Sequence, residues 1–223
     1  MNVIELIKTN KAYFENYITR STYHSNAIEG STLSFAETYA IIFNDNSFKV
    51  NAEPREIYEA INHKYALDYV IKHVDEPLSE RLIKDVATLI NKNVTDFSDY
   101  RTVNVFISGA EHVPPPPENV RNSMMYLVHN YNNTEFDNIF EKVAQFHIDF
   151  EKTHPFQDGN GRTGRLLINY ELLRNNIAPA VIEKDDRTKY FGFLASSDAA
   201  GLANFIEDLS QKELEHVRRF VAE

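Results

Sequence analysis

The stretch that decides the fold is Thr153-His154-Pro155-Phe156-Gln157-Asp158-Gly159-Asn160-Gly161-Arg162-Thr163-Gly164-Arg165. Just before it, apolar residues over positions 140–150 recur at helical spacing, which predicts a helix there. Pro155 lacks an N–H group and disfavours helix at the preceding residue, so this helix is expected to end there. A second helix is expected to begin near Arg162. The stretch is therefore a polar turn between two helices.

The residue types in this turn indicate phosphate binding. Gly159 and Gly161 can adopt positive φ, and Asn160 tolerates it better than most residues, so successive backbone N–H groups can converge on an anion. The following helix adds its free N–H groups and the positive end of its dipole. Arg162 and Arg165 lie three residues apart on one helix face, where each guanidinium can bind phosphate oxygens.

Two further side chains suggest what accompanies the phosphates. Asp158 would repel a bare phosphate, but Mg²⁺ commonly takes one or two carboxylates together with phosphate oxygens and water. His154 can accept a proton near neutral pH. A plain corner between helices, with arginines pairing surface carboxylates, does not require this combination. The residues therefore favour a site for a metal-bound nucleotide.

The stretch resembles the Fic-family motif HPFx(D/E)GNGRxxR and matches it at every specified position. The resemblance implies a protein adenylyltransferase, which moves AMP from ATP to a Ser, Thr or Tyr hydroxyl of a protein, itself included. It implies His154 as the base and Asp158 as a ligand of Mg²⁺. It also implies a nucleotide site made of Gly159, Asn160, Gly161, Arg162 and, at the γ-phosphate, Arg165.

Composition limits the other classes of function. The 223 residues are 43% apolar, enough for one large core, and the formal charge of −10 opposes general attraction to nucleic acid or anionic membranes. There is no cysteine, no apolar run near the roughly 20 residues of a membrane span, and no pattern of a secretory signal. We expect a cytoplasmic protein whose partners are ATP and an unidentified target protein, without nucleic acid or membrane; a homo-oligomer stays open.

Helical spacing recurs along most of the chain, so we expect an all-α fold, a Fic-like helical bundle with one small β-hairpin. Ser34 and Glu37 fit a capping box, Ser79 is a typical N-cap, and Pro54 suits a first helical turn. One domain is expected over 1–223, with N-terminal helices in 1–52, a core in 53–200 and a C-terminal helix in 201–223. The expected helices are 3–17, 21–30, 34–43, 54–72, 80–90, 118–131, 135–153, 162–175, 188–197 and 203–222.

From Arg101 the apolar pattern changes to period two. Val103, Val105 and Ile107 alternate with other residues before Gly109, which predicts a β-hairpin over residues 101–113. We call these residues the flap, because they resemble the Fic-family flap that lies beside the motif and binds the target backbone by strand addition. The alternative is an ordinary hairpin that covers the helical core.

A second resemblance lies near the N-terminus. Ser25-Asn26-Ala27-Ile28-Glu29-Gly30, here called the SNAIEG segment, resembles the Fic-family inhibitory motif (S/T)xxxE(G/N) and is expected on a short helix, residues 21–30. Ser25 and Glu29 are four residues apart and so share one helix face. The resemblance implies autoinhibition, in which Glu29 pairs with Arg165 and competes with ATP. The alternative is a capped surface helix with a solvated glutamate.

Residues 186–190 lie where Fic proteins have part of the adenine pocket, often with Asn where this chain has Asp186. Tyr190 can stack on the base or form a hydrogen bond with it. Two other functions stay open. A hydrolase that removes AMP would use the same site, with Glu29 orienting water. A regulatory or binding module would use the fold without turnover, although an intact motif with His154 argues against it.

Overall fold

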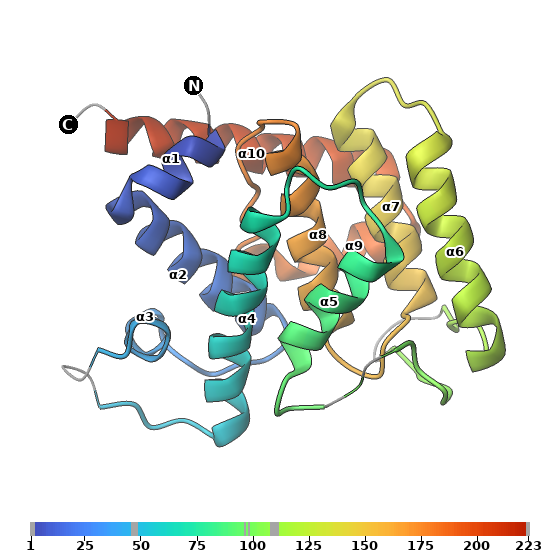
Figure 1. The fold of residues 1–223 in the computed structure, drawn as a ribbon, viewed down its shortest axis with the longest axis horizontal. Helices are drawn as coiled ribbons and strands as arrows, with labels where there is room; N and C mark the ends of the chain where they lie inside the picture. Colours follow the sequence, from blue (N-terminus) through green and yellow to red (C-terminus); the bar gives the residue numbers. More distant parts are fainter. Residues whose placement is uncertain (1–2, 46–48, 96, 98, 108–111, 222–223) are drawn as a thin grey trace.

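Helices form all the regular structure in the residues that the computed structural model describes, which are 3–45, 49–95, 97, 99–107 and 112–221 (Figure 1). The all-α fold class is thereby confirmed. Within this part of the chain, no helix has the length and apolarity needed to cross a membrane. The elements in chain order are α1 (Val3–Thr9), α2 (Lys11–Ile28), α3 (Phe35–Phe43), α4 (Pro54–Lys72), α5 (Glu80–Asn91), α6 (Pro117–Asn133), α7 (Ile139–Thr153), α8 (Asn160–Arg174), the 3-10 helix η1 (Lys184–Asp186), α9 (Arg187–Ser196) and α10 (Ala199–Val221).

Several helices begin where their capping residues predict. The Ser34 side chain accepts from the Glu37 N–H at 3.2 Å, and the Glu37 carboxylate accepts from the Ser34 N–H at 2.9 Å, which completes the capping box of α3. Ser79 accepts from the Leu82 N–H at the start of α5, and Pro54 occupies the first turn of α4. These signals involve neighbours a few residues apart, so the sequence alone locates them.

The prediction of a separate short helix over residues 21–30 is wrong. The helix break falls earlier, at Asn10, whose side chain caps α2 by accepting from the Tyr13 N–H at 3.0 Å. Helix α2 then runs unbroken from Lys11 to Ile28. Several polar residues of this stretch are buried instead, and Thr22 Oγ1 lies 3.1 Å from Nδ1 of the buried His63 ring.

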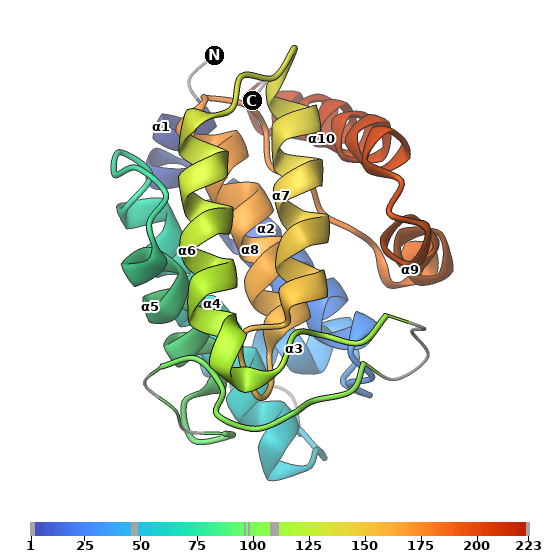
Figure 2. The same cartoon turned by 90° about the vertical axis from the view of Figure 1, so that its right-hand side faces the viewer.

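Helix α8 lies at the centre of the fold. Helix α7 packs on one side of it, α4 and α5 pack on the other, and α6 and α10 cover α7 (Figures 1 and 2). Nearly every residue of α8 is buried, including Arg162 and Arg165, which are 2% and 5% exposed. Two buried guanidinium groups are costly unless they are paired. Their partners, which come from α2 and α4, define the site described below.

The two ends of the described chain pack together. Asn10, between α1 and α2, donates to the carbonyl oxygen of Phe220 near the end of α10, and the Tyr13 and Phe220 rings lie 5.5 Å apart. The main apolar cluster runs from Val3 to Val217 and includes members of all three segments expected from the sequence. The exact bounds of those segments stay a prediction.

The β-hairpin predicted for the flap is not seen. The described flap residues, 101–107 and 112–113, carry no strand, and residues 108–111 lie outside the described part of the chain. The residues that suggested a strand do not bury one face, since Val103 is 49% exposed and Phe106 is 83% exposed. Period two alone cannot produce a strand, because a strand also needs a partner for its backbone.

Side-chain hydrogen bonds hold the flap instead. Arg101, 3% exposed, donates from Nε to the carbonyl oxygen of His154 at 2.8 Å and from Nη2 to that of Pro115 at 2.6 Å. At the other end, His112 Nε2 lies 2.9 Å from the carbonyl oxygen of Lys152. Both ends of the flap are therefore fastened to the end of α7, beside the motif.

Candidate nucleotide-binding site

The turn between α7 and α8 uses backbone conformations that few residues adopt easily. His154 ends α7 with φ 46°, and Gly159 caps α8 with φ 73°. A Cβ at Gly159 would lie 2.6 Å from Asn91 Nδ2, so only glycine fits there. The Asn160 side chain accepts from the Phe156 N–H and donates to the Phe156 carbonyl, both at 2.9 Å. These two hydrogen bonds close the turn and occupy the Asn160 side chain, so Asn160 could bind a ligand only through its backbone.

A cavity of about 480 Å³ opens beside this turn, a size suited to a small-molecule ligand. The motif residues His154, Asp158 and 159–162 form one wall, while the end of the SNAIEG segment and the first turns of α4 form the other. The remaining lining residues are Gly30, Ser31, Glu53, Arg55, Glu56, Glu59, Gln157 and Glu29. The structure thus brings together most of the predicted site, while Arg165 and Tyr190 lie behind the wall.

The imidazole of His154 is partly buried in the cavity wall. Burial lowers its pKa, and the nearby backbone carbonyl of Glu151 opposes only part of that effect. The ring is therefore neutral near pH 7 and able to accept a proton.

The carboxylate of Asp158 is held by cations on both oxygens. Oδ2 lies 2.5 Å from Arg55 Nη2, while Oδ1 accepts from Arg162 Nη2 at 3.1 Å and from the Gly159 N–H at 2.6 Å. Burial raises the pKa of Asp158, but the Arg162 and Arg55 charges outweigh it, so the pKa lies below its usual value. The group is ionised at neutral pH.

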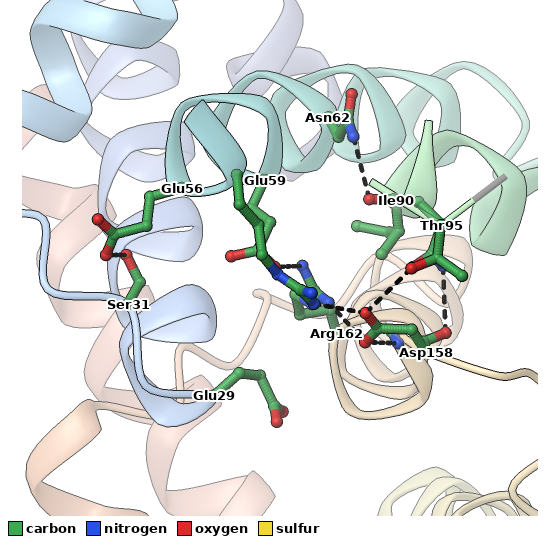
Figure 3. A network of polar contacts seen from close by, with 12 residues as sticks. Glu29, Ser31, Glu56, Glu59, Asn62, Ile90, Thr95, Asp158 and Arg162 are labelled. Carbon is green, nitrogen blue, oxygen red and sulfur yellow. Dashed lines mark hydrogen bonds and ion pairs between the residues drawn. The ribbon is translucent and has the colours of Figure 1, made fainter. Parts of the chain in front are cut away.

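An ionised carboxylate facing a cavity fits a divalent cation, but incompletely. Thr95 Oγ1 is 3.5 Å from Asp158 Oδ2 (Figure 3), and the described residues contain no group of three or more acidic, histidine or cysteine side chains placed to hold a metal. Mg²⁺ usually takes few protein ligands and completes its shell with phosphate oxygens and water. Asp158 could therefore supply one ligand to Mg²⁺, and water or a polyphosphate would have to complete the shell.

Arg162 has a carboxylate on each side. Its Nη1 lies 3.0 Å from Glu59 Oε1, close enough for an ion pair, and its Nη2 reaches Asp158 (Figure 3). Glu59 also pairs with Arg55 Nε at 2.9 Å. Arg55, Glu59, Arg162 and Asp158 therefore form a closed ring of alternating charges, which we call the charge ring.

Arg165 is bound by the SNAIEG segment. Nε donates to Ser25 Oγ at 3.0 Å, and Nη2 donates to the Ser25 carbonyl at 2.9 Å and to Glu29 Oε1 at 2.7 Å. Burial lowers the pKa of Arg165, but the Glu29 carboxylate more than offsets this and the pKa is raised. A Cβ at Gly161 would lie 2.3 Å from Glu29 Oε1, so glycine allows this close approach.

Other helices hold the end of the SNAIEG segment in place. Arg187, the first residue of α9, donates to the Ile28 carbonyl at 2.8 Å. Glu56 of α4 accepts from the Thr32 N–H at 2.5 Å and from Ser31 Oγ at 3.2 Å. Glu29 is thus presented to Arg165 by a fixed backbone.

Tyr190 lies in the core. It has no exposed surface, its hydroxyl is 2.7 Å from His147 Nε2, and its ring faces Arg165 at 5.8 Å. Burial raises its pKa, so it is a neutral phenol. Stacking of adenine on this ring, as predicted, would require the ring to become exposed.

Sequence reasoning missed Arg55 and Glu59. Their spacing of four residues on α4 indicates only an ordinary surface pair along a helix. No local signal shows that this pair faces Arg162 and Asp158, which are about 100 positions away in the sequence.

Comparisons with known proteins show what this chain is similar to. The Fic/DOC family model matches residues 77–172. The chain is 33% identical over 209 residues to "Protein adenylyltransferase Fic" of Nematostella vectensis, covering 88% of this chain and 46% of that relative. It is 31% identical over 219 residues to the protein of the same name from Drosophila willistoni, covering 92% of this chain and 41% of that relative.

The chain thus spans less than half the length of these curated relatives. A solved structure of a Fic-domain-containing signaling protein from Bacteroides thetaiotaomicron has the same fold, with a TM-score of 0.79 at 24% identity; the match covers 95% of this chain and 88% of that one. Residues 77–172 of the chain therefore form a Fic/DOC family domain.

Proposed function

We propose that this chain is a protein adenylyltransferase that moves AMP from ATP to a Ser, Thr or Tyr hydroxyl, and that it is restrained by Glu29. One observation carries the proposal. A neutral histidine, an ionised aspartate and the N-terminus of α8 share one cavity wall, and Glu29 lies on the wall opposite. The names of the curated relatives support the same activity.

His154 would act as the base. The hydroxyl oxygen of the target forms a bond to the α-phosphorus, and the bond from that phosphorus to the oxygen bridging it to the β-phosphate breaks, so that pyrophosphate leaves. The hydroxyl proton passes to the imidazole, which is neutral because burial lowers its pKa. Transfer therefore requires His154 but no covalent intermediate on the protein.

The other motif residues would position the phosphates. The backbone N–H groups of Asn160 and Gly161 and the Arg162 side chain would surround the α- and β-phosphates at the turn that Gly159 allows, and Arg165 would bind the γ-phosphate. Asp158 would hold Mg²⁺, which when bound neutralises part of the charge on the phosphates. Arg162 is fixed before any ligand arrives, since it is 2% exposed and paired with Glu59.

Autoinhibition by Glu29 is supported by the pairing of Arg165. Its guanidinium already donates to Ser25 and Glu29, so a γ-phosphate must compete with a tethered carboxylate held at high effective concentration. The Glu29 charge would also repel the γ-phosphate across a partly desolvated cavity.

The flap would bind the target protein. Val103 and Phe106 are exposed beside the motif, so they offer apolar side chains on which an extended target segment could pack. Proline at Ser108 or Ala110, which should impair target binding, falls outside the described residues. The expected cytoplasmic location stays a prediction, and a homo-oligomer stays open.

The proposal is tested with the full chain, Mg²⁺ and ATP labelled at the α-phosphate, using Glu29→Gly to relieve the restraint. We expect label on the protein and an added mass of one AMP group on a Ser, Thr or Tyr. Glu29→Gly/His154→Ala should show neither. The control is His129→Ala, which changes an exposed histidine on α6 and should leave the incorporation seen in Glu29→Gly unchanged. Transfer that survives His154→Ala or excess chelator would contradict the roles of His154 and Mg²⁺, respectively.

A hydrolase that removes AMP is the second candidate, because Glu29 and His154 line the same cavity and could orient and deprotonate water. Incubation of an AMP-modified protein with the chain and metal, without ATP, separates the two activities. Release of AMP that depends on Glu29 would favour the hydrolase.

A further inference from the structure

Of the two arginines in the charge ring, Arg55 is exposed and Arg162 is buried. The Arg55 side chain is 57% exposed, against 3% for Arg162, and it comes from the first turn of α4, outside the motif. Its Nη2 nevertheless makes the shorter of the two ion pairs with Asp158, 2.5 Å against 3.1 Å. An exposed cation therefore sits on the carboxylate that faces the cavity.

The two oxygens of Asp158 are not equivalent. Oδ1 is taken by two donors that belong to the motif itself, Gly159 and Arg162. Oδ2 is held by Arg55, with Thr95 Oγ1 at the longer distance of 3.5 Å. Any other cation that binds this carboxylate from the cavity competes with Arg55.

We propose that Arg55 occupies the cation site at Asp158 in the free protein, and that it turns to the polyphosphate when a divalent cation takes its place. The inference rests on the proposed function, since it takes Asp158 as the metal ligand. Arg55 can make this move because its side chain lines the cavity. Its Nε can stay bonded to Glu59 while Nη2 leaves Asp158. Arg162 cannot make the move, since it is buried between two carboxylates.

Charge balance explains why the exchange would occur only with nucleotide. The charge ring is neutral, with two carboxylates and two guanidinium groups. A divalent cation at Asp158 leaves Arg55 beside a like charge, and polyphosphate is the anion that can accept it. Arg55 would therefore weaken binding of the metal alone but strengthen binding of the nucleotide.

A purely structural role gives different expectations. Arg55, which is exposed, also pairs with the largely buried Glu59 four residues further along α4, and holding that pair could be its whole role. If that is all Arg55 does, its removal leaves the affinities for metal and nucleotide unchanged. The proposal instead expects that removing Arg55 strengthens binding of the metal and weakens binding of the nucleotide.

The test measures binding of Mn²⁺ alone, followed by electron paramagnetic resonance of the free ion, in the full chain without nucleotide. Arg55→Ala should bind Mn²⁺ more tightly than wild type, on the order of fivefold, the size expected for a partly exposed ion pair. Arg55→Lys, which keeps the charge but not the fork, should lie between them. Arg81→Ala removes a matched exposed arginine paired with Asp85 on α5 and should change nothing.

Binding of ATP is then measured by calorimetry with Mg²⁺ in the Glu29→Gly/His154→Ala background, where turnover is blocked. Adding Arg55→Ala should weaken ATP binding on the order of tenfold, the size of one charge-assisted hydrogen bond. Unchanged Mn²⁺ binding in Arg55→Ala, or unchanged ATP binding, overturns the proposal. If Asp158→Ala binds Mn²⁺ as wild type does, the metal site of the proposed function fails as well; loss of Mn²⁺ binding in Asp158→Ala alone, without the Arg55 effect, rejects only the exchange.

Discussion

Arg101 Nε donates to the carbonyl oxygen of His154 at 2.8 Å, so a flap residue holds the backbone of the candidate base in its left-handed conformation. The same guanidinium reaches the carbonyl oxygens of Val103, Pro115 and Thr153, and the Arg101 N–H donates to Pro155. One buried side chain thereby joins the start of the flap, and Pro115 just after its end, to the end of α7.

We therefore expect Arg101→Ala to lower the free energy of unfolding by about 2–4 kcal/mol, because several buried carbonyls lose a charged donor at once. Arg101→Lys should lose less, since an ammonium group still reaches one or two of these oxygens. Urea denaturation measures both. Equal stability of Arg101→Ala and wild type would mean that these hydrogen bonds do not hold the turn.

Glu29→Gly should raise AMP incorporation from labelled ATP on the order of tenfold to a hundredfold, because it frees a guanidinium from a charged hydrogen bond worth about 1.5–3 kcal/mol. Arg165→Ala should not activate, since it removes the phosphate ligand together with the restraint. Incorporation that stays at the wild-type level in Glu29→Gly would reject autoinhibition, whatever the outcome for His154.

The stability of the protein should fall steeply below about pH 6.5 because His63 is buried. Burial, then the nearby Arg165 and Arg162 charges, lower its pKa from 6.5 to about 3. Above pH 6.5 the ring is neutral in the folded and unfolded chains alike. Below pH 6.5, His63 binds a proton in the unfolded chain but stays neutral in the folded chain. The free energy of unfolding therefore falls by up to about 1.4 kcal/mol per pH unit.

Urea denaturation between about pH 6 and pH 5 measures this slope. His63→Gln should flatten it by about one proton, even if the variant is less stable at every pH. His129→Gln, at an exposed position on α6, is the matched control and should retain the wild-type slope. An unchanged slope in His63→Gln would show that His63 is protonated in the folded protein.

Gly161→Ala should destabilise the protein through Glu29. Alanine is normally favoured over glycine in a helix by about 1 kcal/mol, but here the added Cβ lies 2.3 Å from Glu29 Oε1 and 3.0 Å from Arg165 Nη1. The carboxylate must move and its ion pair weakens, so we expect a loss of about 1–2 kcal/mol.

A double-mutant cycle assigns the cause of that loss. In the Glu29→Gly background the clash with the carboxylate is absent and the Arg165 guanidinium is no longer held by it, so Gly161→Ala should become neutral or stabilising. Gly192→Ala on α9, where an added Cβ meets no described atom within 4 Å, should stabilise in both backgrounds. The same loss with and without Glu29 would place the strain elsewhere in the turn.

The sequence by itself determined the helical class, the turn between α7 and α8, and several helix starts. Ser34 with Glu37, Ser79 with Leu82, and Gly159 at positive φ are decided by residues a few positions apart. Local sterics and capping hydrogen bonds act over that range, so they can be read without knowing the fold. Period two in the flap failed because a strand depends on a partner that local sequence does not specify.

Only the tertiary structure decided which side chains of α4 meet Arg162 and Asp158. Glu59 pairs with Arg162 and Arg55 pairs with Asp158, each across 103 positions of the sequence. The spacing of charges along one helix does not say what another helix presents to it. Because α8 is buried on nearly every side, its two guanidinium groups had to find partners from α2 and α4, and packing alone brought those partners within reach.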